Sequence, residues 1–187
     1  MRRVLAVLMT TICLLLCGCA GEESAVSPAI AFRAELVQAG GCTFCAEVTA
    51  DFGTTVEQFS LEAQANADGT AALEVLAPET IAGITATTSE GGGSITFDGM
   101  AVDFGLLANG NVIPLAAPSI AAACWMREYI CAAGEEDGLY RVTYERDYDE
   151  KRLIVDTWFE NGLPICAEVC YNNQRFLKIL ITEFSMN

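Results

Sequence analysis

Histidine is absent from the 187 residues of the chain, and basic residues are scarce. Without an imidazole, the protein has no Ser–His–Asp or Cys–His catalytic centre and no metal site with a histidine ligand. Ten Lys and Arg residues stand against 25 Asp and Glu, and the formal net charge of −15 disfavours nucleic acid as a partner. Charged residues make up only 19% and hydrophobic residues 52%, so the composition predicts one folded domain rather than a disordered chain.

The amino-terminal residues predict a signal peptide over 1–18. Arg2 and Arg3 precede the apolar run Val4–Leu16, whose 13 residues are too few to cross a bilayer but typical of a signal peptide. Residues 16–19 (Leu-Cys-Gly-Cys) resemble the bacterial lipobox, in which a cysteine thiol receives a diacylglycerol. We therefore expect lipid attachment at Cys19. An uncleaved anchor, or a plain signal peptide with an unrelated cysteine, is the alternative.

Lipid attachment at Cys19 would hold the protein outside the cytoplasm, on a bacterial cell membrane or on an outer membrane. Cleavage before Cys19 would leave eight basic residues against 25 acidic ones, a net charge of −17. Anionic lipids would repel such a domain, so the lipid and not the charge would be the anchor. We expect residues 19–30 to be the lipidated cysteine with a flexible tether, and residues 31–187 to be one domain without internal repeats.

Alternation of apolar and polar residues dominates the mature chain and predicts many half-buried strands. Turn dipeptides separate these strands, and Asn161-Gly162 is the best hairpin turn because both residues tolerate positive φ. Asp68-Gly69, Asp98-Gly99 and Asn109-Gly110 are similar. An apolar face opposite a polar face is typical of an antiparallel sheet. The predicted strands are 32–36, 44–51, 58–65, 73–75, 84–88, 94–97, 101–106, 139–146, 152–159, 163–171 and 175–184.

One segment, Ser119–Ala133, departs from the alternation and predicts a helix. It is rich in alanine and contains neither glycine nor proline, while Pro118 suits its start and Gly134 its end. Apolar residues surround almost its whole circumference, which indicates a buried helix. The fold class expected is mainly β with helical filler (α+β), in which many consecutive antiparallel strands curve around at least one buried helix.

The order of these elements resembles the lipoprotein-carrier half-barrel family (LolA/LolB-like), in particular a lipid-anchored bacterial member. The matching stretches are 32–36 (FRAEL), 69–78 (GTAALEVLAP), 95–99 with 101–106, 153–160, 161–164 (NGLP) and 176–184. The resemblance implies a curved, unclosed antiparallel half-barrel wrapped around at least one buried helix. Its concave apolar face, covered by helices, holds acyl chains in that family. Anchored members of that family engage a protein partner, so the resemblance also implies such a partner for this chain.

Four large side chains of the predicted helix are the candidate lining of such a cavity: Trp125, Met126, Tyr129 and Ile130. The alternative interpretation is that they complete a dry core, because protein interiors favour close packing.

Six cysteines remain after the signal peptide, namely Cys42, Cys45, Cys124, Cys131, Cys166 and Cys170. On a helix Cys124 and Cys131 would lie about 10 Å apart, too far for a disulfide. On one strand face Cys166 and Cys170 would lie about 13 Å apart, again too far. Cys42 and Cys45 could bond across the Gly40-Gly41 turn. Structural disulfides, free thiols and a four-thiolate zinc site from Cys42, Cys45, Cys166 and Cys170 all remain open.

No nucleophile–base pair, phosphate loop or cofactor motif is visible, so we expect no catalytic residues, no cofactor and no metal. The acidic runs at 135–137 and 147–150 lack the spacing of a calcium loop and are expected to be solvated. The expected function is that of a membrane-anchored, non-enzymatic envelope lipoprotein that binds a lipid or acyl chain in the half-barrel. The alternative is an anchored lipoprotein with a dry core that docks an envelope protein, such as a spore-germination factor.

Overall fold

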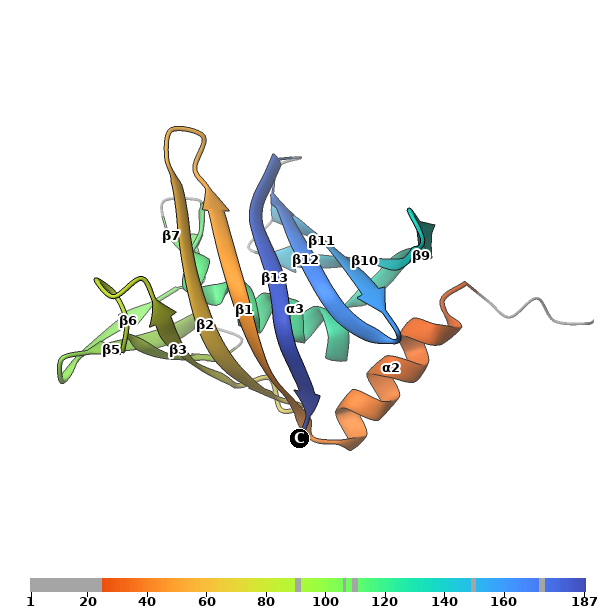
Figure 1. Ribbon diagram of the computed structural model, residues 1–187, viewed down its shortest axis with the longest axis horizontal. Helices are drawn as coiled ribbons and strands as arrows, with labels where there is room; N and C mark the ends of the chain where they lie inside the picture. Colours follow the sequence, from red (N-terminus) through yellow and green to blue (C-terminus); the bar gives the residue numbers. More distant parts are fainter. Residues whose placement is uncertain (1–24, 90–91, 106, 109–110, 149–150, 172–173) are drawn as a thin grey trace, which may run out of the picture.

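The computed structural model describes residues 25–89, 92–105, 107–108, 111–148, 151–171 and 174–187. The predicted signal peptide, Cys19, most of the tether and the Asn109-Gly110 turn therefore lie outside the described residues. A single antiparallel sheet of eleven strands dominates the fold, in the order β6-β5-β4-β3-β2-β1-β13-β12-β11-β10-β9 (Figure 1). Because its two edge strands, β6 and β9, do not pair with each other, the sheet is an open half-barrel, as the sequence predicts.

The strands of this sheet are β1 (Gly41–Asp51), β2 (Val56–Asn66), β3 (Ala71–Ala77), β4 (Thr85–Ser89), β5 (Gly92–Phe97), β6 (Met100–Phe104), β9 (Tyr129–Glu136), β10 (Leu139–Tyr148), β11 (Lys151–Glu160), β12 (Leu163–Tyr171) and β13 (Gln174–Met186). A small second sheet contains β7 (Leu107–Ala108) and β8 (Asn111–Val112), and a 3₁₀ turn, η1, spans Pro114–Ala116. The structure also contains two helices among the described residues, α2 (Ser27–Gln38) and α3 (Ala117–Met126).

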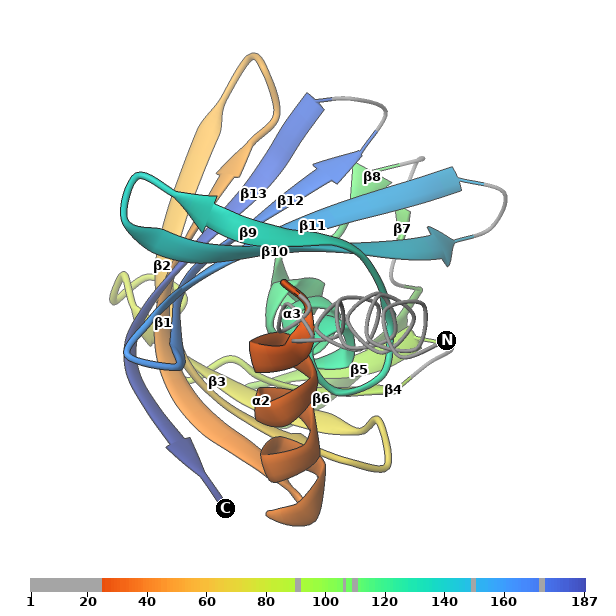
Figure 2. The same ribbon diagram turned by 90° about the vertical axis from the view of Figure 1, so that its right-hand side faces the viewer.

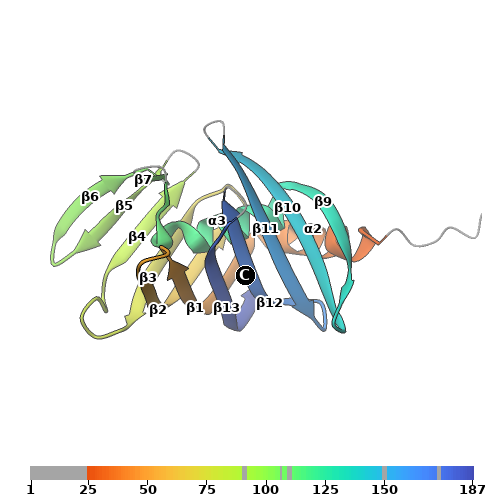
Figure 3. The same ribbon diagram turned by 90° about the horizontal axis from the view of Figure 1, so that it is seen from above.

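Curvature of the sheet brings its apolar face around α3, as Figure 2 shows. Register shifts interrupt the pairing at five positions, for example between Cys45 and Ala46 in β1 and between Trp158 and Phe159 in β11. Such bulges increase the local twist of a strand and so help a sheet to bend. In Figure 3, β5 and β6 lie at one end of the molecule, and β9 and α2 lie at the other.

Two of the predicted hairpin turns have the expected conformation, whereas at Asp68-Gly69 only Gly69 has a positive φ. Asn161 and Gly162 have φ values of 52° and 81°, and Asp98 and Gly99 have φ values of 50° and 76°. Positive φ at both central residues is the signature of the tight turn that suits the right-handed twist of a hairpin. The strands on either side of Asn161-Gly162, β11 and β12, begin and end within one residue of the predicted limits.

The predicted strand at 32–36 is wrong, because these residues belong to helix α2. Ala29, Phe32 and Leu36 are buried, and their spacing of three and four residues places them on one helical face. Gly41, the first residue of β1, has a φ of 133°, and a Cβ there would lie 2.0 Å from the Ala65 carbonyl oxygen. The chain thus needs a glycine to pass from α2 into β1. The helix also begins at Ser27, inside the stretch expected to be tether.

The predicted helix at 119–133 is correct only in its first half. Helix α3 ends at Met126, and residues 129–136 form strand β9. In β9, Ile130 lies opposite Tyr144 and Ala133 lies opposite Val142, so the partly buried side chains complete the inner face of β10. Pairing with β10 outweighed the helix propensity of the alanines, which is worth only fractions of a kcal/mol per residue. Gly134 consequently lies inside a strand and does not end a helix.

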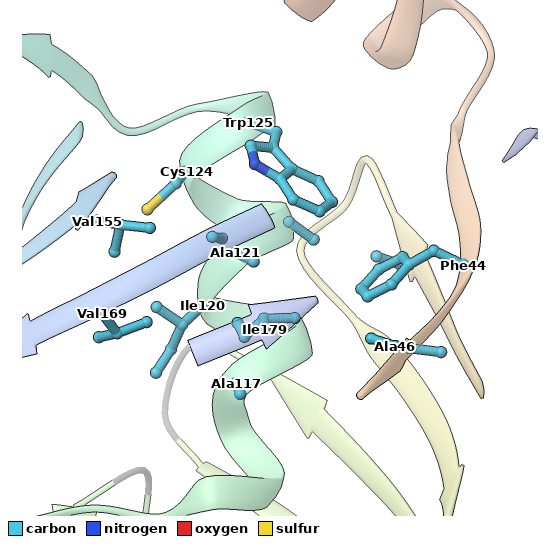
Figure 4. Packing of buried hydrophobic residues seen from close by; sticks show 14 of the residues in the cluster. Phe44, Ala46, Ala117, Ile120, Ala121, Cys124, Trp125, Val155, Val169 and Ile179 are labelled. Atoms are coloured by element: carbon cyan, nitrogen blue, oxygen red, sulfur yellow. The ribbon is translucent and has the colours of Figure 1, made fainter. Parts of the chain in front are cut away.

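Close packing fills the centre of the half-barrel (Figure 4). All residues of α3 except Ser119 are buried, in agreement with its apolar circumference. Trp125 is fully buried, and its ring centroid lies 5.5 Å from that of Phe44 and 5.9 Å from that of Phe184. Its indole Nε1 donates a hydrogen bond of 3.1 Å to the Thr157 hydroxyl, which satisfies both buried polar groups.

Candidate functional site

Helix α2 is held in place by polar contacts at two points. The Tyr140 hydroxyl on β10 donates to the Ala25 carbonyl at 2.8 Å and accepts from the Ala29 amide at 3.3 Å. The guanidinium of Arg33 donates to three carbonyls at the end of α3: Cys124 at 2.9 Å, Trp125 at 3.0 Å and Glu128 at 2.7 Å. These carbonyls lack helical partners and carry the negative end of the helix dipole, so a guanidinium suits them.

An open cleft of about 540 Å³ lies between the first turn of α2 and the nearby ends of β9–β12. Its walls include three aromatic side chains: Phe32 from α2, Tyr140 from β10 and Phe159 from β11. The Phe32 and Phe159 ring centroids are 5.0 Å apart with an interplanar angle of 72°, and those of Tyr140 and Phe159 are 6.0 Å apart. The volume falls within the range of known small-molecule sites. The lining combines these aromatic residues with carboxylates and turn residues, and Phe32 and Phe159 are almost fully buried.

Two carboxylates also line the cleft, Glu135 at the end of β9 and Glu160 at the end of β11. Glu135 lies directly opposite Tyr140, which in turn lies opposite Phe159. Residues directly opposite each other in an antiparallel pair share a face, so Glu135 belongs to the inner face of the sheet. Among the described residues, neither Glu135 nor Glu160 forms an ion pair.

Two further grooves lie on other parts of the sheet. One, of about 700 Å³, lies along β3–β6 and is lined mostly by small polar residues such as Thr87, Thr88, Ser89 and Ser94. The other, of about 360 Å³, lies along β1 and β2 beside Glu47 and Pro78. The cleft at α2 differs from both because its walls are aromatic.

The four predicted lining residues do not lie together around a cavity. Trp125 and Met126 are buried in α3, where Trp125 fills the centre of the core. Tyr129 is 70% exposed at the start of β9, and Ile130 is partly buried against the inner face of β10. Their separation follows from the early end of α3, which places the last two on a strand. The prediction missed Phe32, Tyr140, Phe159 and Glu135, because the docking of α2 and the pairing of β9, β10 and β11 bring them together.

All six described cysteines are free thiols, so the disulfides favoured by the compartment argument do not form in this structure. Cys42 and Cys45 both lie on β1, three residues apart, so they project from opposite faces and cannot bond to each other. Cys131 lies on β9 and not on a helix, which removes the basis of its predicted distance from Cys124.

Burial raises the pKa of every one of these thiols. The pKa of the buried Cys42 thiol rises to about 12. At Cys45, on the polar outer face, the burial effect is joined by the nearby carboxylates of Glu183 and Glu62. A raised pKa keeps a thiol protonated at neutral pH, so none of the six is an activated nucleophile.

A polar network on the outer face holds β9, β10 and β11 together. Arg141 donates to both carboxylate oxygens of Asp156, at 3.1 and 2.9 Å, and to Glu136 at 2.9 Å. The Thr143 hydroxyl donates to Asp156 at 2.6 Å, and the Trp158 indole donates to Glu136 at 2.9 Å. Every member has a partner, so this network stabilises the strands and presents no unsatisfied group for chemistry.

In the described part of the chain, no three His, Cys, Asp or Glu side chains come together in a way that could hold a metal ion. All four cysteines of the zinc interpretation are described, so that interpretation has no support. No helix in the described ranges is both long and apolar enough to cross a membrane. Cys19 lies outside these ranges, and lipid attachment there stays a prediction.

Comparison with known proteins identifies the fold. An outer membrane lipoprotein-sorting protein domain from Vibrio parahaemolyticus superposes with a TM-score of 0.51 at 5% identity, over 87% of this chain and 92% of that one. A DUF1329 family protein from Desulfovibrio piger gives 0.50 at 10% identity, over 86% and 93%. A LolA superfamily protein from Nitrosomonas europaea gives 0.45 at 8% identity, over 85% and 93%.

No family model matches the sequence, and no curated protein is significantly similar to it. The chain shares its open half-barrel fold with the lipoprotein-sorting domain and the DUF1329 protein. At these identities the likeness concerns the fold alone, and it confirms the architecture that the sequence motifs predict.

Proposed function

We propose that the protein is a membrane-anchored, non-enzymatic envelope lipoprotein that binds a lipid or acyl chain. The cleft between α2 and the β9–β12 end of the half-barrel is the observation that carries the proposal. Its lining includes Phe32, Tyr140 and Phe159, and each methylene of an acyl chain that leaves water contributes about 0.8 kcal/mol. The centre of the half-barrel is not the proposed site, because Trp125 already fills it.

The signal-peptide pattern and Cys19 support the anchor part of the proposal. Only seven residues separate Cys19 from Ser27, where α2 begins, so a lipid on Cys19 keeps the start of α2 within about 29 Å of the membrane surface. The cleft is lined by Pro28, Ala29 and Phe32 of this same helix. A ligand leaving the bilayer would therefore reach it over a short path.

Native mass spectrometry of the protein extracted gently from membranes tests the binding. We expect a bound species with the mass of a lipid, and loss of that species in Pro28→Trp, which fills the cleft from an exposed position. Leu76→Trp, at an exposed position on β3 far from the cleft, is the matched control and should retain the ligand. Equal occupancy in both variants would refute the assignment of the cleft.

The anchor has a separate test. Cys19→Ser should remove the diacylglycerol mass and shift the protein from the membrane to the aqueous fraction. Retention of Cys19→Ser at the membrane would point to an uncleaved apolar anchor.

Docking of an envelope protein is the second candidate, and the β5–β6 hairpin favours it. Met100 and Val102 are 68% and 65% exposed there, and they lie opposite Phe97 and Ile95 on the same face. Exposed apolar surface of this kind often marks a protein interface. A photo-crosslinker at residue 102 in intact cells should give one discrete adduct, and Met100→Asp should abolish it. A uniform smear or no adduct would argue against this function.

A further inference from the structure

We infer that strand β6 is the docking edge for an extended segment of a partner protein, in which apolar side chains alternate with lysine or arginine. The segment would add a further antiparallel strand to the eleven-stranded sheet, beside β6. This inference rests on the second candidate function, the docking of an envelope protein, and specifies the chemistry and the conformation of the partner.

The first observation is that β6 is an unprotected edge strand, at the opposite end of the molecule from α2 (Figure 3). It pairs with β5 on one side, and no described strand pairs with its other side. Natural edge strands are commonly blunted by lysine, proline or a bulge. The five residues of β6 (MAVDF) include neither lysine nor proline, and their pairing with β5 runs without a register shift. The edge of β6 is therefore a regular template for an added strand.

The turn between β5 and β6 determines which main-chain groups this edge offers. Both residues of the two-residue turn have positive φ, so the residues that flank the turn, Phe97 and Met100, are a hydrogen-bonded pair. Along antiparallel strands such pairs alternate with pairs that do not bond to each other. The N–H and C=O groups of Ala101 and Asp103 therefore point away from β5, toward the free edge.

The second observation is that the apolar inner face of the half-barrel continues onto β6 and is exposed there. One row of opposite residues crosses β3, β4, β5 and β6, namely Leu73, Ala86, Ile95 and Val102. The first two are buried, Ile95 is partly buried and Val102 is exposed. Met100, on the same face of β6, is exposed as well. Apolar side chains of an added strand would lie beside Met100 and Val102 and remove them from water.

The third observation is the charge of this half of the sheet. Between Arg33 and Arg127 the sequence contains eleven acidic residues and no basic residue, and strands β1–β6 all lie in this stretch. Asp103 is exposed on the outer face of β6, because it follows the inward-facing Val102. A second copy of the chain would bring the same excess of carboxylates to the edge, and like charges repel. A basic segment is attracted by the same charges.

The two faces of β6 together define the sequence pattern of the partner. Side chains of a strand point alternately to opposite faces. With apolar residues at every second position beside Met100 and Val102, the basic residues between them lie on the outer face beside Asp103. In an antiparallel pair, opposite residues share a face, so the basic residues are also the ones whose main chain bonds to Ala101 and Asp103. The main-chain bonds would provide affinity, and the alternation would provide specificity.

Titration with synthetic peptides tests the inference. The first peptide is Lys-Val-Lys-Val-Lys-Val-Lys, and the second has glutamate in place of each lysine. Fluorescence anisotropy reports the binding of each labelled peptide to the full protein in nanodiscs of zwitterionic lipid, with empty nanodiscs as the blank. We expect the lysine peptide to bind at least about tenfold more tightly than the glutamate peptide, because only the lysine peptide complements Asp103 and the acidic half of the sheet.

Two methylated forms of the lysine peptide test the mode of binding. N-methylation at the lysines keeps every side chain but removes the N–H groups that bond to β6, so it should weaken binding by about tenfold or more. N-methylation at the valines is the matched control. The N–H groups of the valines point away from β6, so this peptide should bind within about twofold of the unmodified one.

Ala101→Pro removes a main-chain donor from the free edge of β6, and edge strands tolerate proline where the missing N–H faces solvent. We expect it to weaken binding of the lysine peptide by about tenfold or more. Ala133→Pro is the matched control on β9, the other edge strand, because counting from the Asp137-Gly138 turn places the Ala133 N–H on a free edge too. It should retain full binding, and circular dichroism spectra like that of the unaltered protein show that both variants are folded.

Asp103→Lys tests the charge at the edge without a change in the main chain. It should reduce the preference for the lysine peptide over the glutamate peptide to about twofold or less. Glu62→Lys, at an exposed position on β2, changes the net charge by the same amount away from the edge and should keep most of the preference.

Four outcomes would overturn the inference. The first two are equal binding of the lysine and glutamate peptides, and full binding of the peptide methylated at its lysines. If the crosslinker at residue 102 nevertheless gives one discrete adduct that Met100→Asp abolishes, docking of an envelope protein stands and only strand addition is refuted. Absence of both the adduct and peptide binding would refute the second candidate function as well. A dimer of the chain that Ala101→Pro dissociates would assign the edge to a second copy.

Discussion

Replacement of Arg33 by methionine tests how α2 is attached to the rest of the half-barrel. Methionine keeps an unbranched stem of similar length but removes the guanidinium, and with it the hydrogen bonds to the carbonyls of Cys124, Trp125 and Glu128. A hydrogen bond from a charged donor contributes about 1.5–3 kcal/mol when its acceptor stays buried after removal.

These contacts are only partly buried, so water can reach some of the carbonyls that lose their partner. We therefore assign about 1 kcal/mol to each of the three bonds, and expect Arg33→Met to lower the free energy of unfolding by about 3 kcal/mol. Single domains are stable by about 5–15 kcal/mol, so this loss is large. Arg33→Lys keeps the charge near the end of α3 but lacks the planar fork, and should recover about half of the loss.

Urea unfolding followed by far-UV circular dichroism measures the change, with an unaltered m value as the check that the unfolded state is comparable. Arg175→Met is the control, because Arg175 forms an exposed ion pair with Glu168, and we expect a loss of at most about 1 kcal/mol. If Arg33→Met is no more destabilising than Arg175→Met, the guanidinium does not hold α2 to α3 and the reasoning fails.

Three further predictions concern the core, the outer face and the thiols. Trp125→Phe leaves the buried Thr157 hydroxyl without its partner and should lower the free energy of unfolding by about 2–4 kcal/mol in urea titrations; a loss under about 1 kcal/mol would contradict it. Asp156→Asn removes the charge that binds Arg141 and should cost about 2 kcal/mol in the same assay, whereas an unchanged midpoint would show that the network is not stabilising. In mass-spectrometric alkylation at pH 8, the exposed Cys131 should react at least about tenfold faster than the buried Cys42, whose pKa is about 12. Both rates should rise with pH, because each raised pKa leaves the thiol protonated below it, and equal rates would contradict the burial of Cys42.

The β11–β12 hairpin shows how much of the fold can be predicted from local pattern. Its alternation requires one face in the core and one in solvent, and Asn161-Gly162 supplies the positive φ values of its turn. Alternating residues and turn residues determine the local structure through their immediate neighbours in the chain. The two strands that they predict are observed with nearly the predicted limits. The same reasoning holds for β1, β2 and β13.

Residues 32–36 show where local pattern is ambiguous. Phe32 and Leu36 are four residues apart, a spacing that suits both one strand face and one helix face over so short a stretch. Packing against α3 and the hydrogen bonds from Arg33 to the end of α3 stabilise the helical conformation of these residues. Likewise, residues 129–133, which the sequence predicts as helix, form strand β9 because they pair with the edge of β10.

Most strand positions, the Asn161-Gly162 and Asp98-Gly99 turns and the burial of α3 follow from the sequence itself, because they depend on alternation, turn chemistry and an apolar circumference. Helix α2 and strand β9 do not. Only the tertiary structure decided that the centre is filled by Trp125 and that the cleft lies beneath α2. Both depend on contacts between residues far apart in the chain, such as Phe32 with Phe159 and Glu135 with Tyr140. The spacing of residues along the chain does not encode such contacts, since strand pairing and helix docking create them.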